Sequence, residues 1–428
     1  MEKIRSGQTF LYRQNGLNST VLDIRMKEKV RGDLLQRAFT ITIQRYPYMA
    51  SKLVEKGGNY YLEKSYLSMD VIRTDKIRTL GSMSTGYHLI DVTYWDKKIL
   101  VSFHHALCDG RGIKPFLETL IYYYCCLRYN RNLNPVGIRL QGESLLVGET
   151  QEPVGDSKFE VNKSKLPKVI REGYALPENS ERCGKYYRYE IKINRNDFLD
   201  YMKDNKATPA ILLSLLVSKS ILEIHSNIDK PIVCSMAMDY RKEINLANTH
   251  KNCVASLYLP YSDKMKDLSV AEQSKIYRKI IQEQRTPDAI KNTINTQIEL
   301  CMKLDQLPSL EEKRQFMSFF NDMQIDTYVI SYLGQIKLGD SDKYVESIHL
   351  YNSGVNGLRI NMICAGDYFT IDLLQDFQSE SLILAFRETL DGTNMEYAIS
   401  EMIQFETTKD KAHITASRQA ERYMIYNY

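Results

Sequence analysis

The sequence predicts a mixed α/β protein in which two lobes, each about 200 residues long, combine a sheet with covering helices. Strand-like and helix-like apolar patterns alternate in both halves of the chain. Residues 130–184 interrupt them with four prolines, many charges and little periodicity. A chain of 428 residues that is 43% hydrophobic can bury two cores. We therefore predict an N-terminal lobe, residues 1–180 including this crossover, and a C-terminal lobe, residues 181–428.

In the first half, period-two patterns predict strands at residues 21–26, 49–54, 60–63, 88–94 and 98–103. Asp33 is the expected N-cap of a helix that runs to Arg45 and ends before Pro47. A stronger helical pattern follows Gly110, with apolar residues at positions 113, 116, 117, 120, 121 and 124. Pro115 is tolerated only near a helix start, so residues 109–111 are expected at the N-terminus of this helix.

The second half is expected to repeat this mixture of strands and helices. Its predicted strands are residues 186–193, 231–238, 254–259, 328–332, 344–351, 358–365 and 368–374. Its predicted helices are residues 196–205, 210–224 and 379–390, with helical patterns from a capping box at Ser269 through about residue 323. Residues 394–428 also read as helical, without an assignable role.

Composition argues against several classes of protein. The 57 basic and 53 acidic residues are interspersed, so no basic stripe for nucleic acid is expected. The eight cysteines form no CxxC pair, which favours reduced thiols over a disulfide framework or a zinc site. The N-terminal residues have no apolar core typical of a secretory signal, and the longest apolar stretch, residues 209–217, is too short to span a bilayer. A cytoplasmic protein without a membrane span is expected.

The chemistry is expected where the strand at residues 98–103 meets the following helix, because His104, His105, Asp109 and Gly110 gather there. A metal site would need further ligands, yet the five other histidines are scattered singly. A serine nucleophile is not favoured because no GxSxG is present, and Asp109 would raise the pKa of its neighbour Cys108. A general base remains, since histidine has an ordinary pKa near 6.5. The alternative is a histidine pair that merely ends a strand.

Residues 104–110 read HHALCDG and match the HHxxxDG signature of the superfamily that includes chloramphenicol acetyltransferase, peptide-synthetase condensation domains, alcohol acetyltransferases and plant BAHD acyltransferases. Three weaker segments occur in the order of that superfamily: residues 34–54, the MDYR of residues 238–241 followed by Asn252, and the SYLG of residues 331–334. The DFGWG motif of the plant enzymes is absent, because residues 376–378 read DFQ. The sequence thus resembles a stand-alone member of this superfamily.

The resemblance implies two chloramphenicol acetyltransferase-like lobes, each an α/β two-layer sandwich, that form a pseudodimer around a central cleft and tunnel. It also implies a role for each site residue. His105 would be the catalytic base, His104 would support it, and Asp109 would pair with an arginine, for which Arg241 is the candidate. Gly110 would let the backbone turn into the helix. The expected cleft-lining residues are Asn252, Ser331 and Gly334.

The implied reaction moves an acyl group from a CoA or carrier-protein thioester to a hydroxyl or amine acceptor, without an acyl-enzyme. Acyl-CoA or an acyl-phosphopantetheine would be a co-substrate, and neither a tightly bound cofactor nor a metal is expected. Expected partners are the small-molecule donor and acceptor, with an acyl or peptidyl carrier protein as a further candidate for a monomeric enzyme. Two alternatives stay open: a non-catalytic protein that binds a carrier protein, and a hydrolase that uses water. The sequence does not identify the donor, its chain length or the acceptor.

Overall fold

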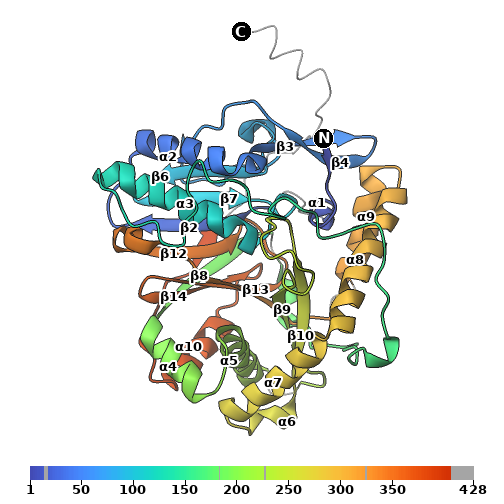
Figure 1. The fold of residues 1–428 in the computed structure, drawn as a ribbon. Coiled ribbons are helices and arrows are strands. Elements are labelled where there is room, and N and C mark those ends of the chain that lie inside the picture. Colours follow the sequence, from blue (N-terminus) through green and yellow to red (C-terminus); the bar gives the residue numbers. More distant parts are fainter. Residues whose placement is uncertain (14–17, 183, 226–227, 323–324, 406–428) are drawn as a thin grey trace.

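The computed structural model describes residues 1–13, 18–182, 184–225, 228–322 and 325–405 (Figure 1). Two sheets with their helices lie one above the other, and a small third sheet flanks the upper one (Figure 1). The upper unit, here the first lobe, is built mainly from the first half of the chain, and the lower unit, the second lobe, from the second half. The predicted two-lobed α/β architecture is confirmed.

The first lobe is centred on a five-stranded sheet in the order β12-β2-β7-β6-β5. Its strands are β2 (Thr20–Met26), β5 (Ile72–Arg73), β6 (Ile90–Trp95), β7 (Lys98–Phe103) and β12 (Val345–Asn352). Helices α2 (Gly32–Arg45) and α3 (Gly110–Tyr129) contribute to the same apolar core. The flanking sheet has the order β1-β4-β3, from β1 (Glu2–Lys3), β3 (Ser51–Lys56) and β4 (Asn59–Lys64), and the short α1 (Gln8–Leu11) follows β1.

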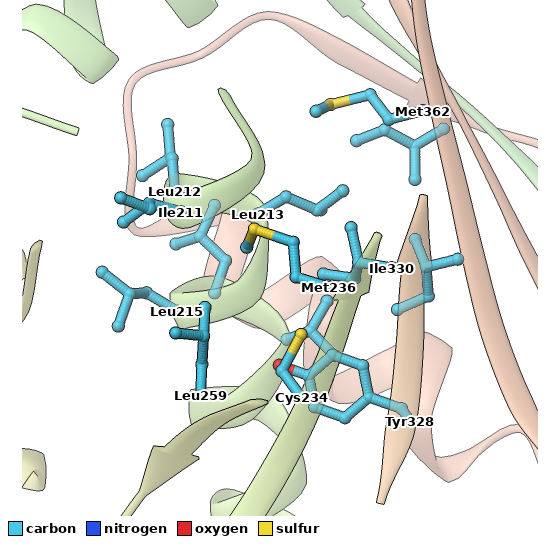
Figure 2. Packing of buried hydrophobic residues seen from close by; sticks show 14 of the residues in the cluster. Ile211, Leu212, Leu213, Leu215, Cys234, Met236, Leu259, Tyr328, Ile330 and Met362 are labelled. Carbon is cyan, nitrogen blue, oxygen red and sulfur yellow. The ribbon is translucent and has the colours of Figure 1, made fainter. Parts of the chain in front are cut away.

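The second lobe is centred on an eight-stranded sheet in the order β10-β9-β11-β13-β14-β8-β15, with β16 also paired to β8. Its strands are β8 (Tyr186–Asn194), β9 (Ile232–Asp239), β10 (Val254–Tyr261), β11 (Tyr328–Gln335), β13 (Leu358–Ala365), β14 (Tyr368–Gln375), β15 (Tyr397–Ile399) and β16 (Ile403–Phe405). Its helices are α4 (Arg195–Asp204), α5 (Pro209–Ile224), α6 (Asp263–Lys266), α7 (Val270–Gln284) and α10 (Ser381–Asp391). Leucines of α5 pack against one face of this sheet, on side chains such as Met236, Ile330 and Met362 (Figure 2).

Two features tie the lobes together. Strand β12 comes from the second half of the chain but pairs antiparallel with β2, as in the Leu350↔Leu22 register. Helices α8 (Pro287–Gln306) and α9 (Leu310–Asp322) run beside both lobes (Figure 1). Early residues of α8, such as Ile294, lie in the second core, whereas Leu304 lies in the first. The boundary at residue 180 therefore stays a prediction. After that residue the chain returns once more to the first lobe, where β12 joins its sheet.

Most predicted elements coincide with observed ones within a few residues, and two predictions were wrong. Asp33 does not cap α2: Arg31 occupies the N-cap position, and the Asp33 carboxylate accepts hydrogen bonds from the Arg31 guanidinium inside the first turn. Residues 397–405 are not helical, because they form β15 and β16 on the free edge of β8. Pairing with an available edge overrides local propensity there. The rest of the predicted terminal helix, residues 406–428, lies outside the described residues, as does Cys183.

Among the described residues, no single helix combines the length and hydropathy that a membrane span needs. Helices α4 and α5 reach that length and composition only as a pair, across a bend of 83°.

Candidate active site

A cavity of about 950 Å³ lies between the lobes. Its first-lobe lining includes Phe10, His105 and Gly110, whereas Ser331 and Arg359 come from strands of the second lobe. Each lobe therefore supplies one wall, and a molecule in the cavity would contact both. A cavity between two lobes is a common position for a small-molecule site.

His105 is the residue of the predicted motif whose side chain faces this cavity. It follows the end of β7, and its imidazole stacks on Phe10 with ring centroids 4.5 Å apart and planes 19° apart. A side chain at Gly7 would meet the His105 carbonyl oxygen at 2.2 Å, so the N-terminal segment packs directly on this turn. Nδ1 of His105 is buried without a hydrogen-bond partner among the described residues, which leaves Nε2 as the ring nitrogen that can meet a ligand.

The environment of His105 keeps its imidazole neutral. Burial is the main cause that lowers the pKa of His105 below its ordinary value, to about 3, and the nearby His104, Arg359 and Arg13 lower it further. Protonation beside these groups would place another positive charge where cations already lie. A neutral imidazole at neutral pH can accept a proton, which is what a general base requires.

His104 has a structural place in the same turn. It is 2% exposed, and its Nδ1 accepts a hydrogen bond from the Ala106 amide at 3.0 Å. His104 does not line the cavity. Cys108 is also buried, and burial together with Asp109 raises the pKa of its thiol well above the ordinary value. Of the two histidines, His105 is therefore the one that lines the cavity, while His104 and Cys108 are buried within the turn.

Asp109 joins the two lobes from a fully buried position. Its Oδ1 accepts hydrogen bonds from the Arg241 guanidinium at 2.6 Å and from the Gly112 amide at 2.8 Å, so it caps α3 as well. Its Oδ2 accepts from the Cys253 amide at 2.8 Å. Arg241 is equally buried and donates from Nε to the Thr249 carbonyl at 2.9 Å. This is the partner that the resemblance suggested, and both charges are paired and hydrogen-bonded as burial demands.

Two glycines at the start of α3 allow the second lobe to approach. A side chain at Gly110 would meet Leu333 at 2.6 Å, and one at Gly112 would meet the His250 carbonyl oxygen at 2.0 Å. Neither glycine has a positive φ. The role expected for Gly110 in the backbone turn stays a prediction, and what the structure shows is its close approach to the second lobe. Gly112 was missed from the sequence, although it is part of the same DGRG segment.

The other predicted cleft residues divide between two locations. Ser331 and Gly334 line the cavity from β11, and Gly334 has a φ of 82° where the register between β11 and β13 shifts. Asn252 does not line the cavity. It is 6% exposed, and its side-chain amide donates to the Ser6 carbonyl at 3.2 Å, so it anchors the N-terminal segment instead.

Apart from Ser331 and Gly334, the second-lobe wall was not predicted from the sequence. It is formed by every second residue of β9, β10, β11 and β13, since alternate side chains of a strand share a face. The alternate residues that line the cavity are Ser235, Ala237, Asp239, Val254, Ser256, Tyr258, Val329, Ser331, Leu333, Arg359 and Asn361, and Met238, Tyr332 and Gly334 line it as well. The intervening residues, such as Cys234 and Ile330, face α5 (Figure 2). The alternation of small and polar residues with apolar ones was the available signal.

The crossover between the lobes also reaches the cavity. Glu149 accepts two hydrogen bonds from the guanidinium of the buried Arg45, at 2.9 and 3.1 Å, and a third from the Tyr48 hydroxyl at 2.7 Å. Its carbonyl accepts from the His250 amide at 3.0 Å, and the ring of His250 stacks on Tyr48 at 4.1 Å. These contacts join the crossover to both lobes at the edge of the cavity.

One group among the described residues has the composition of a metal site. Potential ligand atoms of Glu190, His349 and Asp372 lie within 4.8 Å of one another. Arg188 already pairs with both carboxylates, with Asp372 at 2.8 Å and Glu190 at 2.9 Å, and Arg25 pairs with Glu190 as well. A buried ion-pair network thus accounts for this group, and it lies outside the lining of the cavity.

No protein-family model and no curated protein matches the sequence. Solved structures do match. Polyketide synthase associated protein 5 from Mycobacterium tuberculosis has 14% identity and a TM-score of 0.59, over 91% of this chain and 98% of that one. The first condensation domain of the CDA synthetase has 12% identity and a TM-score of 0.57, over 94% and 99%. TRI101 from F. graminearum, complexed with coenzyme A and T-2 mycotoxin, has 11% identity and a TM-score of 0.54, over 93% and 100%. The chain therefore shares the fold of these three proteins, one of them a condensation domain and another complexed with coenzyme A.

Proposed function

We propose that this chain is an acyltransferase that moves an acyl group from a thioester to a hydroxyl or amine, with His105 as general base. The observation that carries the proposal is a neutral imidazole that faces a cavity with one wall from each lobe. A fold shared with an enzyme complexed with coenzyme A supports a thioester donor. The donor is acyl-CoA or an acyl-phosphopantetheine on a carrier protein, and no tightly bound cofactor is required.

The reaction follows from the chemistry of His105. Nε2 takes the proton from the acceptor hydroxyl or amine as the acceptor attacks the thioester carbonyl carbon. The carbon–sulfur bond then breaks, and the same imidazolium returns the proton to the departing thiolate. No acyl-enzyme is needed, and the nearby thiol of Cys108 is held protonated by its raised pKa. We place the enzyme in the cytoplasm, because the seven described cysteines are free.

Wild-type protein tests the proposal. With a panel of acyl-CoA thioesters and a mixture of alcohols and amines, we expect thiol release, followed with a thiol reagent, to depend on the acceptor. Acyl-phosphopantetheine on a carrier protein is the second donor to test. Equal thiol release with and without acceptors would instead indicate a hydrolase. Carrier-protein binding without thioester consumption would indicate a non-catalytic role.

The pH profile provides a separate prediction. Because the pKa of His105 is lowered, by burial first and then by His104, Arg359 and Arg13, the base stays neutral in acid that would protonate an ordinary histidine. We expect the acidic limb of kcat/KM to lie well below pH 6.5. Circular dichroism in the same buffers separates loss of the base from unfolding. A limb at pH 6.5 or above would contradict the assigned environment of His105.

A further inference from the structure

Among the charged residues that line the cavity, two arginines and one carboxylate act electrostatically on one another. Arg13 and Arg359 both line the cavity, and so does Asp326. Arg13 follows α1 and belongs to the first lobe, whereas Arg359 lies on β13 and Asp326 just precedes β11, both in the second lobe. The two guanidinium groups therefore reach the same space from opposite walls.

These charges are incompletely paired. Within the described parts of the chain, neither arginine has an ion pair within 4.0 Å or a hydrogen bond through its side chain, and Nε of Arg13 is buried without a partner. Burial lowers the pKa of Arg13 and lowers that of Arg359 to about 10, with only Asp326 opposing the shift through its charge. Burial also raises the pKa of Asp326. Both arginines are half-buried at the cavity wall, where one carboxylate faces two guanidinium groups, so the cluster can accept one further anion.

The cluster lies close to the reacting centre. The Arg13 guanidinium lies over the ring of Phe10 at 4.7 Å, and the other ring contact of Phe10 is the stack on His105 at 4.5 Å. Both arginines act electrostatically on His105 itself. The phosphates of a CoA donor are separated from its thioester by the whole pantetheine arm, so they cannot reach an anion site at this depth when the thioester is beside His105.

We propose that Arg13 and Arg359 bind a carboxylate carried by one of the two reacting substrates. A planar guanidinium matches a carboxylate in a bidentate geometry, and two of them from opposite walls would also fix the orientation of the substrate. The carboxylate belongs either to the far end of the acyl chain or to the acceptor. This inference deepens the proposed function and rests on the assignment of His105 as the base.

Binding of matched probes tests the proposal without requiring turnover. The two members of each probe pair differ in a terminal carboxylate. For the acyl donor, the pair is the N-acetylcysteamine thioesters of glutarate and pentanoate. For the acceptor, the pair is 6-hydroxyhexanoate and 1-hexanol. We expect calorimetry to give a Kd about tenfold or more lower for the carboxylate member of one pair. The pair that shows the preference identifies which substrate carries the charge. No preference in either pair would overturn the proposal.

Variants assign the preference to residues. We expect it to disappear in Arg359→Met and in Arg13→Met, two separate variants in case one fails to fold, and to persist in Arg37→Met, which removes an exposed arginine of α2. An unchanged preference in both cavity variants would overturn the assignment. The preference must also persist in His105→Ala. If wild-type protein transfers no acyl group but keeps the preference, the proposed function fails while the carboxylate site stands.

Discussion

Replacing His105 with alanine is expected to lower kcat for acyl transfer by about 10²–10⁴-fold, the usual contribution of a positioned general base. The residue faces the cavity, and burial with its neighbours lowers its pKa so that the imidazole is neutral. KM should change less than kcat, because the binding walls remain. Thiol release under saturating donor and acceptor measures the effect.

His225→Ala is the matched control for that experiment. It also removes a histidine side chain, but one that is partly buried outside the lining of the cavity. Nε2 of His225 lies 3.3 Å from Oε1 of Glu178. We expect activity within about twofold of wild type, as for most changes away from a site. Thermal unfolding of both variants separates catalysis from stability. Turnover by His105→Ala at the wild-type rate would refute the assignment of the base.

Replacing Asp109 with alanine is expected to destabilise the fold by about 3–5 kcal/mol, the typical cost of breaking a buried ion pair. The variant leaves the Arg241 guanidinium without its closest carboxylate and removes the acceptor of two amide hydrogen bonds. Activity should fall as well, because Asp109 holds the start of α3 against the second lobe. Urea unfolding monitored by circular dichroism measures the stability.

The double variant Asp109→Ala, Arg241→Met provides the internal control. It removes both buried charges, so we expect it to be more stable than Asp109→Ala alone. Asp239→Asn removes a carboxylate that also pairs with Arg241 but is partly exposed, and a smaller loss is expected. If Asp109→Ala unfolds at the wild-type urea concentration, the buried pair does not stabilise the contact between the lobes.

The sequence allowed most elements to be predicted because they are locally periodic. The stripe of α3 and the alternation in β7 each extend over several residues, so their patterns are clear. The position of β12 was not predictable in this way. Its own pattern indicates a strand, but nothing within residues 345–352 states that its partner is β2 rather than a strand of the second half. Pairing across that distance is a property of the whole fold.

The part of the candidate site that could be predicted is the part whose residues lie next to one another in the sequence. His105, Asp109 and Gly110 lie within one short segment, whereas the opposite wall takes alternate residues from four strands. Phe10 was missed because a single aromatic residue in a helix of only four residues carries no periodic signal. Arg13 was missed for the same reason, and its position beside the cavity depends on packing between segments far apart in the chain.

The pairing of β12, from the second half of the chain, with β2 has a consequence for the synthesis of the protein. A ribosome releases the N-terminal lobe long before residues 345–352, so β2 leaves the exit tunnel with one edge unpaired. An open strand edge is a site for unwanted pairing with other chains. Completion of the first sheet must therefore wait until residues 345–352 have been synthesised, and until then this edge of β2 is open to such pairing. The first sheet is thus completed by a strand that the chain reaches only after most of the second lobe.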